Sequence, residues 1–172
     1  MTQSFVLETS RLCLLELTLE DAGFILELLN EPDFVRFIGD RGVRTLDDAR
    51  SYLQKGALAS YERFGFGLWL VQLQSSKESL GICGLVKRES LQDIDIGYAF
   101  LERFWRNGYA SEAVLAVKNY ALHSLGIKRL VAITDQDNIG SIRVLEKIGM
   151  KYERLVRLSD DGPELKLFGV SG

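Results

Sequence analysis

The sequence predicts an α/β (α+β) fold built on a mixed, mostly antiparallel sheet flanked by helices. Three apolar runs at short intervals, residues 66–73, 81–86 and 93–100, leave no room for crossover helices and indicate an antiparallel meander. A long helical pattern then leads to a β-branched apolar run at 130–134, which indicates a right-handed crossover and one parallel strand pair. A turn-rich segment at 159–163, between two further extended runs, indicates a closing hairpin.

The composition is that of a globular protein. The chain has 172 residues, 47% hydrophobic and 26% charged, enough for one domain spanning residues 1–172 that buries about 70% of its unfolded surface. Its net charge of −3 gives neither the basic footprint of a nucleic-acid-binding protein nor a polybasic membrane patch. No basic segment precedes an apolar run near Met1, and no run of about twenty apolar residues occurs. We therefore expect a cytoplasmic monomer or homodimer with no nucleic-acid or membrane partner.

Residues that could hold a metal ion are scarce. Cys13 and Cys83 are far apart in the sequence, neither belongs to a C-x-x-C motif, and the chain has one histidine. We expect reduced, buried cysteines and no metal site.

The first third of the chain is expected to form a strand and a set of helices. Residues 11–17 are mostly apolar, as expected for a first strand. Thr18 and Asp21 have the spacing of a capping box and predict a helix that starts there and ends near Pro32. A second capping pattern at 45–48 opens another helix toward Tyr61. The aromatic residues between these helices either plug the core or line an acceptor pocket.

The last third is expected to alternate helix and strand before the hairpin. Ala110, Ala113, Val114 and Val117 hold helical spacing, and Gly126 stands where this helix should end. After the strand at 130–134, Asn138 is a good N-cap for a short helix over 141–148. The hairpin strands are predicted at 152–158 and 164–170.

A polar, glycine-broken turn at 104–113 runs from the third meander strand directly into the long helix. The first amides of a helix have no intrahelical partner, and the helix dipole adds about half a positive charge there. Arg106 adds a formal charge, and Gly108 permits a positive φ and a close approach of phosphate oxygens to the backbone. This turn is therefore a candidate anion site.

Other interpretations of this turn stay open. A glycine turn before a helix is also an ordinary connection in α/β proteins. The sequence lacks G-x-x-x-x-G-K-[ST], and Gly65-Phe66-Gly67 lacks the third glycine of G-x-G-x-x-G. A P-loop enzyme and a Rossmann dehydrogenase are therefore not expected.

Four blocks of the chain carry family motifs, in order. Residues 104–113 are Phe-Trp-Arg-Asn-Gly-Tyr-Ala-Ser-Glu-Ala, which is similar to Y-W-G-x-G-Y-A-T-E-A. Residues 7–12 resemble L-x-T-x-R-L, residues 95–98 resemble E-I-G-Y, and residues 138–150 resemble N-x-x-S-x-R-V-L-E-K-x-G-F. These motifs identify a resemblance to the GNAT superfamily of N-acetyltransferases, in particular its RimJ/RimL-like branch. The resemblance spans nearly the whole chain.

The resemblance implies a splayed sheet with acetyl-CoA as co-substrate in the gap between the strand ending near Phe100 and the strand at 129–134. The pyrophosphate would lie on the amides of residues 106–110, and the pantetheine along the strand edge. The implied coenzyme contacts are Tyr98, Ala99, Phe100, Arg106, Asn107, Gly108, Tyr109, Ala110, Ser111, Asn138 and Lys147.

The resemblance also implies catalytic roles. Asp95 occupies the position of the branch's strand carboxylate and is the candidate to take the proton of the amine, through water. Many relatives have a tyrosine general acid where this chain has Leu145, so Ser141 is the nearest substitute and Asn138 a candidate to hold a pantetheine amide or a water. Each of these residues also has a structural interpretation: Asp95 as a surface or strand-pairing aspartate, and Asn138 and Ser141 as good helix starters. The chain departs from the family pattern further at Trp105, Arg106 and Leu15.

The implied activity is transfer of acetyl from acetyl-CoA to a primary amine by direct attack in a ternary complex. The acceptor is a protein N-terminus or a small amine, and a lone aspartate suits a low-pKa α-amine better than a lysine. Candidate acceptor contacts are Phe37, Trp69 and Glu164. Two alternatives remain, a non-catalytic acyl-CoA-binding module and a plain phosphate-binding scaffold.

Overall fold

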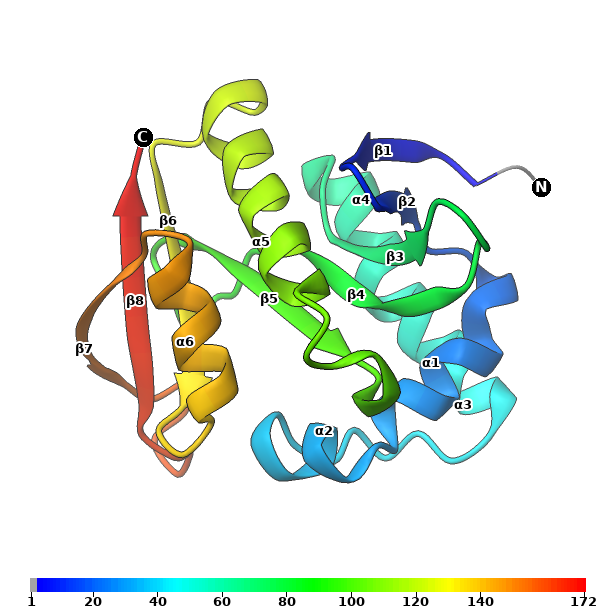
Figure 1. Ribbon diagram of the computed structural model, residues 1–172. Helices are drawn as coiled ribbons and strands as arrows, with labels where there is room; N and C mark the ends of the chain where they lie inside the picture. The colour runs from blue at the N-terminus through cyan, green and yellow to red at the C-terminus, as the bar shows by residue number, and fades with distance from the viewer. Residues whose placement is uncertain (1–2) are drawn as a thin grey trace.

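The sheet of the computed structural model, which describes residues 3–172, has eight strands in the order β1-β2-β3-β4-β5-β6-β8-β7 (Figure 1). All neighbouring strands are antiparallel except β5 and β6. The predicted mixed, mostly antiparallel sheet is therefore confirmed. The strands are β1 Phe5–Glu8, β2 Leu12–Glu16, β3 Leu68–Leu73, β4 Ser79–Val86, β5 Ile94–Phe100, β6 Arg129–Asp135, β7 Lys151–Val156 and β8 Leu165–Ser171.

Helices cover both faces of the sheet. The core cluster on one face takes side chains from α1, α2 and α3, and the cluster on the other face takes side chains from α5 and α6. The helices are α1 Ala22–Leu29, α2 Pro32–Phe37, α3 Leu46–Leu53, α4 Ala59–Phe64, α5 Tyr109–Asn119 and α6 Ile139–Lys147. Short 3-10 turns (η1 Leu19–Asp21, η3 Glu102–Phe104) and π turns (η2 Gln54–Leu58, η4 Tyr120–Ser124) adjoin them.

The helix boundaries follow the capping signals in the sequence. Thr18 and Thr45 both form complete capping boxes, with Asp21 and Asp48. The side chain of Asn138 accepts a hydrogen bond from the amide of Ser141 at 3.2 Å and so caps α6. The predicted starts of these helices are confirmed.

Two features of the sheet differ from the sequence expectation. The short edge strand β1 was not predicted, because its four residues are exposed or only half-buried and give no hydrophobic alternation. The closing hairpin is antiparallel as predicted, but its second strand, β8, lies between β6 and β7. Hairpin strands pair with each other whichever one docks on the sheet, so local pattern does not decide this order.

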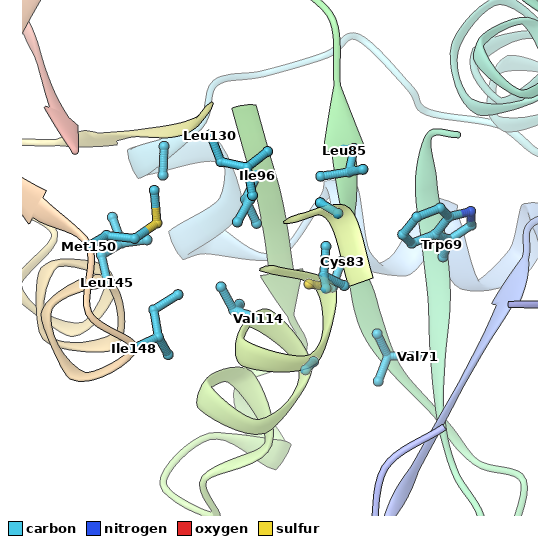
Figure 2. Close-up of a cluster of buried hydrophobic side chains, with 14 of the residues drawn as sticks. Trp69, Val71, Cys83, Leu85, Ile96, Val114, Leu130, Leu145, Ile148 and Met150 are labelled. Atoms are coloured by element: carbon cyan, nitrogen blue, oxygen red, sulfur yellow. The ribbon is translucent and has the colours of Figure 1, made fainter. Parts of the chain in front are cut away.

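The larger core cluster lies between α5, α6 and the centre of the sheet. Small residues at the start of α5 let this helix lie close to β4 and β5, and Ala113, Val114 and Val117 are fully buried. Figure 2 shows Leu145 grouped with Ile148 and Met150 in this cluster. Leu145, at the family's tyrosine position, is therefore a core residue in this chain.

Candidate active site

The site forms where β5 and β6 separate. These parallel strands pair only at Ile94↔Leu130 and Asp95↔Val131, although β5 continues to Phe100 and β6 to Asp135. The strands therefore splay at their carboxyl ends, which is where α/β sheets commonly bind ligands. Two cavities meet at this gap, and both are lined by Phe37, Tyr98 and Ala99.

The smaller cavity, of about 520 Å³, is lined by the end of β5, the turn at 104–111 and the first turns of α6. It brings together most of the predicted coenzyme contacts: Tyr98, Ala99, Phe100, Arg106, Gly108, Tyr109, Ala110, Ser111 and Asn138. Two predicted contacts do not line it. The side-chain amide of Asn107 instead donates to the carbonyls of Phe104 and Trp105 at 3.1 Å each, and Lys147 is exposed in the last turn of α6.

The turn before α5 presents unpaired amides to this cavity. Gly108 is the N-cap of α5 with φ of 80°, and no side chain of residues 3–172 caps the helix there. The first amides of α5 are thus free to meet a ligand, with the helix dipole behind them. Arg106 also has a positive φ of 66°, which an arginine adopts at a cost of about 1–2 kcal/mol. The indole of Trp105 donates to the carbonyl of Phe100 at 2.9 Å and ties the turn to β5.

A polar network joins this turn to the N-terminal hairpin. Arg11 donates to the carbonyl of Asn107 at 3.0 Å, forms a 2.8 Å ion pair with Glu112, and stacks 4.5 Å from the ring centroid of Tyr109. The hydroxyl of Thr9 donates to Glu112 at 2.5 Å. Burial acts to raise the pKa of Glu112, but the hydrogen bonds from Thr9 and Arg11 outweigh it and lower that pKa. This network was not predicted from the sequence, although the L-x-T-x-R-L block contains both Thr9 and Arg11.

Replacing Arg11 by Met is expected to weaken acetyl-CoA binding because the turn loses its anchor. The loss of one ion pair and one hydrogen bond is worth about 1–2 kcal/mol, or roughly a 5- to 30-fold rise in Kd. Isothermal titration calorimetry measures this directly. Arg50→Met is the matched control, since Arg50 forms an exposed ion pair with Asp47 and lines neither cavity. Equal Kd values for the two variants would contradict the anchoring role.

Two hydroxyl groups meet at the gap between the strands. The hydroxyl of Tyr98 lies 2.5 Å from Ser141 Oγ and 3.2 Å from the carbonyl oxygen of Ser141. Burial raises the pKa of Tyr98, against the opposing hydrogen bond from Ser141, so the phenol stays protonated at neutral pH. Tyr98 and Ser141 therefore place two hydrogen-bonded hydroxyl groups beside the smaller cavity.

The larger cavity, of about 1130 Å³, opens on the face that carries α1, α2 and α3, and Asp95 lines it. The side chain of Asp95 is 1% exposed, and its Oδ2 accepts from Arg88 Nε at 3.2 Å. Its Oδ1 has no hydrogen-bond partner among residues 3–172. Burial raises the pKa of Asp95, and the charge of Arg88 opposes this rise. The result is a buried carboxylate with one oxygen free to accept a proton.

The structure separates the three predicted acceptor contacts. Phe37 lines both cavities. Trp69 is 2% exposed, packs edge-on against Tyr120 in the core and lines neither cavity. Glu164 is exposed after the β7–β8 turn, where it lies 3.4 Å from Arg157, and it also lines neither cavity.

No helix within residues 3–172 has the length and apolar character needed to span a membrane. The same part of the chain contains no group of three or more His, Cys, Asp or Glu side chains placed to hold a metal ion.

Comparison with known proteins agrees with this geometry. The model of the acetyltransferase (GNAT) domain matches residues 11–151. The uncharacterized N-acetyltransferase YoaA of Bacillus subtilis is 31% identical over 153 residues, which cover 88% of this chain and 86% of that protein.

Solved structures share the fold over nearly their whole length. An acetyltransferase from Agrobacterium tumefaciens superimposes with a TM-score of 0.82 at 23% identity, covering 100% of this chain and 95% of that one. The ribosomal L7/L12 α-N-protein acetyltransferase RimL, in complex with coenzyme A, superimposes with a TM-score of 0.84 at 18% identity, covering 98% of each chain. The family match spans most of this chain, and the YoaA alignment spans most of both proteins. The chain therefore belongs to the GNAT family and is an acetyltransferase.

Proposed function

We propose that this protein transfers the acetyl group of acetyl-CoA to a primary amine by direct attack within a ternary complex. The observation that carries the proposal is the meeting of two cavities at the splayed ends of β5 and β6. One cavity has unpaired helix amides for a diphosphate, and the other has the buried carboxylate of Asp95. Each reactant would thus have its own entrance, and the two would meet beside Tyr98 and Ala99.

In the proposed reaction, the neutral amine nitrogen attacks the thioester carbonyl, so that a C–N bond forms and the C–S bond breaks. Asp95 accepts the proton of the amine, directly or through one water. Ser141, hydrogen-bonded to Tyr98, donates a hydrogen bond to the departing sulfur, which leaves as a thiolate. The proton that Asp95 took from the amine passes through solvent to this thiolate, which regenerates the carboxylate. Because a thiol has a pKa near 8.5, this leaving group needs little acid assistance, and burial of Leu145 in place of a tyrosine is compatible with turnover.

Amine pKa values favour an α-amine as the acceptor. A free α-amine has a reference pKa of about 7.7–8.0, against about 10.4 for lysine, so a larger fraction of it is neutral near pH 7. A single carboxylate base suits the first better than the second. RimL, which shares this fold, is by its name an α-N-protein acetyltransferase. The acceptor class therefore includes protein N-termini and small molecules with a comparable amine.

Replacing Gly108 by Ala is expected to weaken acetyl-CoA binding roughly 5- to 30-fold, the equivalent of about 1–2 kcal/mol. A Cβ here both strains the positive φ and intrudes where the phosphates would approach the backbone. Gly126→Ala is the matched control, because Gly126 also has a positive φ, of 69°, but lines neither cavity. Both variants should lose similar stability, and only Gly108→Ala should lose affinity.

Three further measurements test the coenzyme site and its alternatives. Titration of the wild-type protein with acetyl-CoA should shift the amide NMR signals of residues 106–111, and unmoved signals would contradict the coenzyme site. Binding of acetyl-CoA without acetylation of any amine or peptide in a broad screen would favour the acyl-CoA-binding module, for which the buried Leu145 is the supporting observation. Equal thermal shifts with ATP and acetyl-CoA would favour the phosphate-binding scaffold.

A further inference from the structure

Basic side chains dominate the wall of the larger cavity. Of the charged residues that line this cavity, six are basic and three are acidic, although the net charge of the chain is −3. The basic residues are Arg36, Arg41, Lys55, Arg63, Lys87 and Arg88, and the acidic ones are Asp48, Asp95 and Asp135. The cavity thus has the opposite sign of charge from the protein as a whole.

Within residues 3–172, Arg88 is the only one of the six that pairs with a carboxylate, and Lys87 donates to the carbonyls of Leu91 and Gln92 at 3.0 Å and 3.2 Å. The other four basic groups are not neutralised. Within residues 3–172, Arg36, Arg41, Lys55 and Arg63 form no ion pair, whereas other exposed arginines, such as Arg44 and Arg103, do. Arg36 and Arg63 instead lie over the rings of Phe37 and Phe64, 4.6 Å and 4.9 Å from the centroids. These four residues, called the basic wall below, come from α2, the loop after it, η2 and α4.

The acidic residues of the cavity are mostly engaged. The carboxylate of Asp48 accepts hydrogen bonds from the backbone amides of Arg44 and Thr45, at 3.0 Å and 3.1 Å, and the second belongs to a capping box. The carboxylate of Asp135 accepts a hydrogen bond from the backbone amide of Asp137 at 2.8 Å. Only Asp95 presents a buried oxygen without a partner. The cavity therefore offers one carboxylate for one amine, and an excess of positive charge for the rest of the acceptor.

We infer that the acceptor is an amine that carries an anionic group, a carboxylate or a phosphate, and that the basic wall binds this group while Asp95 faces the amine. This inference rests on the proposed acetyl transfer. A polyamine or another polycation would place its additional charges against the basic wall and gain nothing from Asp95 beyond its first amine. The anionic group can belong to a free small molecule or to an acidic residue close to a protein N-terminus.

The test compares acceptors with the same α-amine and different second residues. The dipeptides Gly-Glu, Gly-phosphoserine, Gly-Gln and Gly-Lys, all amidated at the C-terminus, present the same glycine α-amine and no terminal carboxylate. Differences in kcat/KM for acetylation of that α-amine therefore report the second side chain. We expect the two anionic dipeptides to exceed Gly-Gln by about tenfold and Gly-Lys by more, as charged clefts focus oppositely charged substrates. This preference should shrink between 0.05 and 0.5 M salt, because the basic wall is exposed to solvent. A decapeptide beginning Gly-Glu separates the two sources, since turnover well above that of Gly-Glu would indicate a protein N-terminus.

Variants locate the effect. Arg41→Gln combined with Lys55→Gln should reduce the preference for Gly-Glu over Gly-Gln severalfold while the Kd for acetyl-CoA and the Tm stay unchanged. Arg50→Gln, an exposed arginine outside the cavity, is the matched control and should keep the full preference.

Equal turnover of the four dipeptides, or a preference unchanged in the double variant, would overturn the inference. If acetyl-CoA binds but none of the acceptors is acetylated, the proposed function fails by itself. Calorimetry of dipeptide binding then tests the anion site. Tighter binding of Gly-Glu than of Gly-Lys, weakened in the double variant, supports the site. Equal binding of the two dipeptides overturns it.

Discussion

The Asp95→Asn variant is expected to lose about 10²–10⁴-fold in kcat/KM for the amine, the range contributed by general-base catalysis, while its Kd for acetyl-CoA stays unchanged. The amide keeps the shape of the carboxylate but cannot take a proton through the free Oδ1. Steady-state kinetics at pH 7, together with calorimetry of acetyl-CoA binding, measures both quantities. Asp93→Asn is the matched control. Asp93 directly precedes β5, accepts a hydrogen bond from Arg129 Nε at 3.1 Å and lines neither cavity.

The pH dependence and the stability of this variant distinguish a base from a structural aspartate. Asp95 acts as a base only when ionised, so wild-type activity should rise with pH through its raised pKa, and the Asn variant should regain activity at alkaline pH as the amine deprotonates itself. Burial holds the folded-state pKa of Asp95 above its ordinary value, so the ionised form lowers stability at pH values above that pKa. The Asn variant should therefore unfold at the same or a higher temperature at pH 7. A lower Tm with unchanged kcat/KM would indicate a structural role instead.

The Trp69→Ala variant is expected to lose about 3–5 kcal/mol of unfolding free energy, as for other large-to-small core substitutions involving an aromatic. Trp69 is 2% exposed, belongs to the larger core cluster and packs edge-on against Tyr120, with 5.8 Å between the ring centroids. In a chain of this length the loss corresponds to a fall in Tm of roughly 6–20 °C, measurable by scanning calorimetry.

Two further variants separate packing from substrate contact at Trp69. Phe5→Ala removes an aromatic ring that is 59% exposed and should change stability by less than about 0.5 kcal/mol. Trp69→Phe should recover much of the lost stability and leave the KM for the amine unchanged. A large rise in KM for the amine in Trp69→Phe, with little loss of stability, would restore Trp69 as an acceptor contact.

The sequence by itself determined most of the helices and strands, and the turn that opens α5. Hydrophobic periodicity, capping residues and glycine positions are local features of the sequence. They predict the helix starts at Thr18, Thr45 and Asn138 that the structure has. The turn around Gly108 was identified for the same reason, because a positive φ and unpaired helix amides belong to a few consecutive residues.

Only the tertiary structure decided which side chains share a cavity. The Thr9–Glu112 contact joins residues 103 apart, and the basic wall collects side chains from separate helices and loops. The separation of β5 from β6, the insertion of β8 and the burial of Trp69 likewise depend on how distant segments pack. Periodicity specifies which face of an element is buried, but not which element covers it, because many arrangements remove the same apolar area from water.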